Sequence, residues 1–138
     1  MEDIMATITH AREAVVQTLY ALEQGNDQAI EQFDELLKEK KIRNKKAEFA
    51  RELLKGVLKH KDEIDKIIKE HLIDWDFDRL DKIDKQILRL GVYELKYTDT
   101  PFQIIIDEAV KIAKNFSEDK AKSFINGILD RVAKEVRA

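Results

Sequence analysis

Residues 83–96 read IDKQILRLGVYELK, and their apolar positions decide the class of fold. Ile83, Ile87, Leu90 and Tyr93 follow one another at steps of four, three and three residues. This spacing matches the 3.6-residue period of an α-helix and would place all four side chains on one buried face. A half-buried strand would instead need an apolar residue at every second position. We therefore predict a helix with one face in the core.

The same period extends from this segment toward both ends of the chain. Apolar residues at helical spacing also mark residues 11–22, 30–37, 49–58, 64–72, 105–113 and 121–132. No stretch alternates convincingly enough to predict a strand. We predict an all-α protein of about seven helices.

Several residues are suited to begin or end these helices. Thr9 can cap the first helix, and Gly25 can stop it. Pro101 suits the first position of the sixth helix, where its missing N–H has no cost. Ser117 can cap the last helix.

A connector at residues 74–81 breaks the helical pattern, and we expect Trp75 and Phe77 to pin it to the core. No flexible Gly/Ser-rich linker is present. We therefore predict a single domain over residues 1–138, with an N-terminal helical subdomain at about 6–73 packed on a C-terminal one at about 74–138.

Three glycines lie inside predicted helices, at Gly56, Gly91 and Gly127. Each costs roughly 1 kcal/mol relative to alanine. We expect them to allow close approach between helices; a surface kept flat for a partner is the alternative.

The composition indicates the cellular compartment and excludes some kinds of chemical site. Of the 138 residues 38% are charged, the formal net charge is −3, and there is no cysteine. These features exclude disulfides and cysteine metal sites and suit a reducing cytoplasm. With no long apolar run and no secretory pattern at the N-terminus, we expect a cytoplasmic protein with no membrane segment.

Motifs for catalysis are missing. None of the three histidines has the glutamate spacing of a helical zinc site, and there is no glycine-rich phosphate loop or nucleophile elbow. The aspartates of residues 74–78 imitate the start of a calcium loop, but Arg79 and Lys85 stand where glycine and glutamate are needed. We predict no enzyme activity, no metal and no cofactor.

Two basic regions could contact phosphates. Six of the nine residues in 38–46 are Lys or Arg, which suits either a solvated helix end or a phosphate-binding patch. The second region combines the start of the first helix with the junction before the last helix, and it includes His10, Arg12, Lys114, Lys120 and Lys122.

Four motifs lie in a fixed order along the chain. They are residues 11–20, AREAVVQTLY; 87–95, ILRLGVYEL; 106–114, IDEAVKIAK, which follows Pro101; and 124–130, FINGILD. Together they resemble the NusB family of transcription antitermination factors.

The resemblance implies an all-helical fold of two packed subdomains that binds boxA-type single-stranded RNA together with the ribosomal protein NusE. It further implies action on RNA polymerase at ribosomal RNA operons, with no catalysis and no cofactor. Both monomers and homodimers occur in the family. A scaffold that binds only protein is the alternative.

The resemblance also suggests which residues bind. On the RNA side it favours Arg12, His71, Lys120, Lys122 and Phe124, and the chemistry of the side chains adds His10 and Gln17. On the NusE side the candidates are Glu13, Tyr20, Asp84 and Arg89. Ile8, Thr9 and His10 stand where other members have arginines, so we expect tight RNA binding to belong to the heterodimer.

Overall fold

The computed structural model describes residues 7–137, which hold seven α-helices, one short 3-10 helix and no strand. The predicted all-α class and helix number are therefore confirmed. The chain divides into two compact units, the first ending at Lys55 and the second beginning at Gly56. This division falls inside α3 (Asn44–Lys59), whereas the sequence suggested the connector after residue 73.

The first unit contains α1 (Ile8–Glu23), α2 (Phe33–Glu39) and most of α3. α1 packs against α2. The buried apolar side chains of this unit come from all three helices and from the turn after α2, and they include Ala11, Val15, Leu19, Phe33, Leu37, Ile42, Ala50 and Leu53.

The cap of α1 is Thr7, and the prediction of Thr9 is wrong. The Thr7 side chain accepts a hydrogen bond from the backbone N–H of His10 at 3.2 Å. In return, Nδ1 of His10 accepts from the backbone N–H of Thr7 at 2.9 Å. This reciprocal pair satisfies two helix-end donors. Gly25, with a φ of +99°, follows the end of the helix, as expected.

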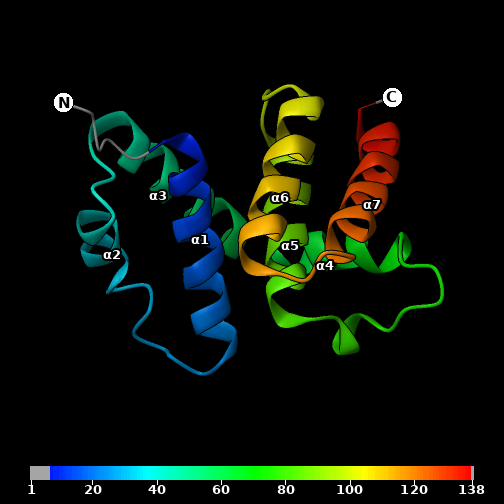
Figure 1. Ribbon diagram of the computed structural model, residues 1–138, viewed down its shortest axis with the longest axis horizontal. Helices are drawn as coiled ribbons and strands as arrows, with labels where there is room; N and C mark the ends of the chain where they lie inside the picture. Colours follow the sequence, from blue (N-terminus) through cyan, green and yellow to red (C-terminus); the bar gives the residue numbers. More distant parts are fainter. Residues whose placement is uncertain (1–6, 138) are drawn as a thin grey trace. The chain divides into compact units, whose positions relative to one another are not determined.

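The second unit is built around α5 (Lys82–Tyr97). α5 packs against α4 (Lys61–Glu70), α6 (Phe102–Phe116) and α7 (Ala121–Val136). α6 also packs against α7, and Figure 1 shows α5, α6 and α7 together. Its core consists of large aliphatic side chains, among them Ile64, Ile68, Ile87, Leu88, Leu95, Ile105, Ile112, Ile125 and Leu129.

Two glycines permit close approach within this unit. A Cβ atom added at Gly91 would lie 2.8 Å from a methyl group of Leu129 on α7. One added at Gly56 would overlap the Tyr93 ring of α5. At Gly127 the nearest atom would be 3.6 Å away, so only the first two glycines fit the close-approach prediction.

The ends of α6 and α7 differ from expectation. Pro101 precedes α6 as its N-cap residue rather than its first helical residue. Ser117 ends α6, and its hydroxyl donates a hydrogen bond to Asp84 instead of capping α7. The prediction of a Ser117 cap is therefore wrong, because α7 begins only at Ala121, with Lys120 as its N-cap residue.

The connector between α4 and α5 contains the 3-10 helix Phe77–Arg79, capped by the Asp76 side chain. Phe77 is buried, as predicted, whereas Trp75 is 59% exposed. Trp75 precedes the 3-10 helix, and its ring lies against that of Phe124 on α7, with 5.5 Å between the ring centres. The prediction that Trp75 anchors the connector to the core is therefore wrong.

Candidate RNA and partner interface

Five predicted site residues lie on α1 in the first unit. His10 and Tyr20 are exposed, and Gln17 is half-buried. Arg12 and Glu13 are buried, with Arg12 only 3% exposed. The Arg12 guanidinium lies 5.1 Å from the centre of the Phe49 ring, a cation–π contact. This placement gives Arg12 a packing role and leaves little of it to meet a phosphate.

Gln17 lines a hollow of about 380 Å³ in the first unit. Its walls come from α1, α2 and the turn between them, and include Thr18, Gln32 and Leu36. The Oε1 atom of Gln17 is buried and accepts no hydrogen bond. A buried acceptor without a donor costs about 1–3 kcal/mol, so this atom is available to a donor that enters the hollow.

Three predicted residues of the second unit come together at one pocket of about 300 Å³. Asp84 at the start of α5 and Lys120 and Phe124 at the start of α7 all line it. The structure thus joins a residue expected to face NusE with two expected to face RNA. Lys122 lies beside this group on α7 and is half-buried.

Burial raises the pKa of the Asp84 carboxyl above its ordinary value of 3.8. The hydrogen bond from Ser117 acts in the opposite direction, while the charges of Asp81 and Glu118 raise the pKa further. A carboxylate kept partly from water among like charges is costly to ionise. A cationic or hydrogen-bond-donating ligand would relieve that cost.

Arg89 is held between two helices of the second unit. Its Nε and Nη2 atoms donate to the two carboxylate oxygens of Asp65 on α4, at 2.8 and 3.0 Å. Its Nη1 atom donates to Gln86 at 3.0 Å. This paired and buried guanidinium joins α5 to α4, which favours a structural role over direct partner contact.

His71 ends α4 and is similarly engaged. Its Nδ1 atom lies 2.8 Å from the carbonyl oxygen of Ile67, and its Nε2 atom 3.3 Å from the Glu135 carboxylate. The side chain is 10% exposed. Little ring face is therefore open for stacking on a base.

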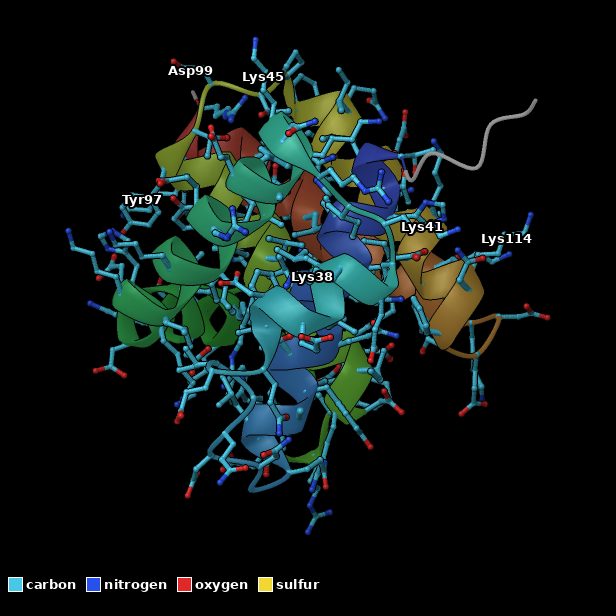
Figure 2. The ribbon with its side chains drawn as sticks, turned by 90° about the vertical axis from the view of Figure 1, so that its left-hand side faces the viewer. Lys38, Lys41, Lys45, Tyr97, Asp99 and Lys114 are labelled. Carbon is cyan, nitrogen blue, oxygen red and sulfur yellow. The ribbon has the colours of Figure 1, made fainter. Side chains whose placement is uncertain are left out.

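The basic stretch 38–46 spans the end of α2, a turn and the start of α3. Figure 2 shows Lys38, Lys41 and Lys45 with their side chains extending from the ribbon, and all three are exposed. Lys41 occupies the left-handed region with a φ of 59°. The stretch thus presents cations, but no aromatic ring is stacked among them.

Sequence reasoning missed Trp75 as a candidate site residue. It lines the pocket with Lys120, and its ring centre lies 5.5 Å from that of Phe124 at an interplanar angle of 60°. A large aromatic side chain is usually buried, which is why the sequence suggested an anchor. The aspartates on either side of it were the available signal of exposure.

Within residues 7–137 no group of His, Asp and Glu side chains could hold a metal ion. No helix in that range is long and apolar enough to cross a membrane. The described residues therefore define an all-α protein whose second unit carries an aromatic and charged pocket.

Comparison with known proteins identifies the family. The profile of the NusB family matches residues 9–134. The transcription antitermination protein NusB of Nitratiruptor sp. is 52% identical over 133 residues, which cover 96% of each chain. The chain belongs to the NusB family.

Solved structures agree with this assignment. T. maritima NusB superposes with a TM-score of 0.85 at 34% identity, covering 95% of this chain and 93% of that one. A crystal structure of the antitermination factors NusB and NusE in complex with double-stranded RNA gives a TM-score of 0.82 at 33% identity, covering 92% and 96%.

Proposed function

We propose that this protein is a transcription antitermination factor that binds boxA-type RNA together with NusE. The observation that carries the proposal is the pocket of the second unit, where Asp84 meets Lys120 and Phe124. A carboxylate suits a basic protein partner, whereas a lysine and an aromatic ring suit RNA. A family relative is seen in complex with both NusE and RNA.

We further propose a fuller role, which membership of the family supports. The protein acts in the cytoplasm, as part of the complex that joins RNA polymerase on ribosomal RNA operons. It contributes binding alone and uses neither a catalytic step nor a cofactor. Its target is the single-stranded form of boxA, since unstacked bases offer faces and edges that a duplex hides.

NusE supplies a large part of the RNA affinity. The formal net charge of −3 and the buried Arg12 leave α1 with little positive charge to offer a phosphate backbone. Phosphate neutralisation provides most of the sequence-independent affinity for nucleic acids. A basic partner that binds Asp84 in the second unit would add positive surface beside Lys120.

The test is the dissociation constant of labelled boxA RNA at several salt concentrations, with and without NusE. We expect NusE to tighten binding and to steepen the dependence of log K on log salt. If NusE binds the protein but changes neither the RNA affinity nor its salt dependence, the proposal that NusE supplies much of that affinity is wrong. Duplex boxA, measured in parallel, should bind more weakly than the single strand.

Two lysine variants locate the phosphate contacts. Lys120→Ala should lower the slope of log K against log salt concentration by about one unit, because one phosphate contact is lost. Lys45→Ala, in the basic stretch of the first unit, is the matched control and should leave the slope unchanged. The reverse outcome would place the RNA surface on residues 38–46.

A protein-only scaffold is the second candidate, and the burial of Arg12 favours it. It predicts that the chain binds NusE with normal affinity, while boxA and scrambled RNA bind the complex no better than NusE alone binds them.

A further inference from the structure

Trp75 is the single tryptophan of the chain, and 59% of it is exposed. Burying an indole is one of the largest apolar gains a side chain can make, so leaving it in water forgoes stability. Its neighbour Ile73 is also exposed, but Ile73 lines no part of the pocket. Trp75 does line it, as one wall opposite the start of α7.

The two aromatic rings of the pocket make a suitable platform for a flat ligand. Trp75 and Phe124 meet at 60° rather than in parallel, so they do not stack fully on each other. Leu80 and Ala121 complete the apolar lining. A nucleobase is a planar group that stacks on such faces whatever its identity.

Three carboxylates, Asp81, Asp84 and Glu118, and one lysine, Lys120, line the pocket, so its affinity for a base rests on the aromatic rings and on Lys120 rather than on its net charge. Asp81 accepts hydrogen bonds from the backbone N–H groups of Ile83 and Asp84, at 2.9 and 3.1 Å, and Asp84 accepts one from Ser117. Two of the three lining carboxylates are therefore already used within the fold; Glu118 is the third.

The positive charge lies at the start of α7. Lys120 and Lys122 stand there, and the first turn has no acidic residue. Cations at a helix N-terminus add to the positive end of the helix dipole, which is unfavourable for the helix but favourable for a bound phosphate.

We propose that Trp75 stacks on a base of the bound RNA, beside Phe124, while Lys120 neutralises the adjoining phosphate. The inference rests on the proposed RNA-binding function and adds to it a residue that the family resemblance did not supply. It assigns the connector between α4 and α5 a part in RNA binding.

The fluorescence of Trp75 tests this directly, because all indole emission of the chain comes from this one site. Titrating boxA RNA into the complex with NusE should quench the Trp75 emission, with the same midpoint as the change in anisotropy of labelled RNA. A tryptophan-free variant of NusE removes any emission from the partner. An unchanged emission at saturating RNA would contradict the proposal.

Substitutions give a second readout. Trp75→Ala should weaken RNA binding by roughly 5- to 150-fold, the effect of losing one stacked base. Trp75→Phe should retain most of the affinity, and Ile73→Ala should retain all of it. Replacing one nucleotide at a time by an abasic one should identify a single position at which Trp75→Ala has no further effect.

The outcomes separate this inference from the function it rests on. If RNA binds normally to Trp75→Ala, the stacking role is wrong and the proposed function stands. If NusE alone quenches the emission and Trp75→Ala weakens only NusE binding, the pocket receives a protein side chain and the inference is again wrong. If the intact complex binds no RNA, both are wrong.

Discussion

At the scale of single residues, the carboxyl group of Asp84 links stability to binding. Its pKa is raised chiefly by burial, so the folded state holds the proton more tightly than the unfolded chain does. The free energy of unfolding therefore falls as the pH rises from the ordinary value of 3.8 through the raised folded pKa, and it stays lowered above that. At neutral pH the ionised Asp84 destabilises the fold.

Asp84→Asn removes this cost, because the amide is neutral and its oxygen can still accept from Ser117. We expect the variant to unfold at a higher urea concentration at pH 7, with a gain of about 1 kcal/mol. The gain should shrink as the pH approaches 3.8. Exposed Asp119→Asn is the control and should show neither effect. A variant less stable than the parent at pH 7 would contradict the account.

The helical glycines give a paired prediction. Gly56→Ala should destabilise the fold by about 1–2 kcal/mol, since overlap with the Tyr93 ring outweighs the gain in helix propensity. Gly127→Ala has room for the methyl group and should stabilise it by up to about 1 kcal/mol. Urea unfolding of both variants measures the difference. Effects of the same sign would refute the close contact at Gly56.

At the scale of elements, the pairing of α4 with α5 depends on Arg89 and Asp65. Arg89→Ala leaves the Asp65 carboxylate without its two-point partner and should cost about 3 kcal/mol. Lys96→Ala removes a more exposed ion pair, with Glu63, between the same two helices, and should cost about 0.5 kcal/mol. Chemical unfolding measures both variants. Equal losses in the free energy of unfolding would show that burial of the Arg89–Asp65 pair has no special effect.

The helices could be predicted from the sequence because each has a single buried face, and burial repeats with the helical period. Helix ends could not be predicted as well. Thr7 and Thr9 are equally good caps by type, and the choice depends on His10 reaching back to the Thr7 amide. Ser117 was misassigned because its partner, Asp84, is distant in sequence and near only in the fold.

At the scale of the whole molecule, the sequence motifs indicated the family, and the comparisons confirmed it. The sequence could not show that Asp84, Lys120 and Phe124 line one pocket, since they come from two helices. Nor could it show that Arg89 and His71 are engaged within the fold, because ion pairs and caps leave no periodic signal. The residue types suggested what chemistry each candidate side chain could perform, but only the fold could show which of these side chains are exposed.

The central claim is that this protein and NusE together recognise boxA RNA. The most direct measurement is an equilibrium competition, in which unlabelled boxA or a scrambled RNA of equal length displaces labelled boxA from the complex at physiological salt. We predict that boxA competes at a much lower concentration than the scrambled RNA. Equal competition by both RNAs would contradict the account.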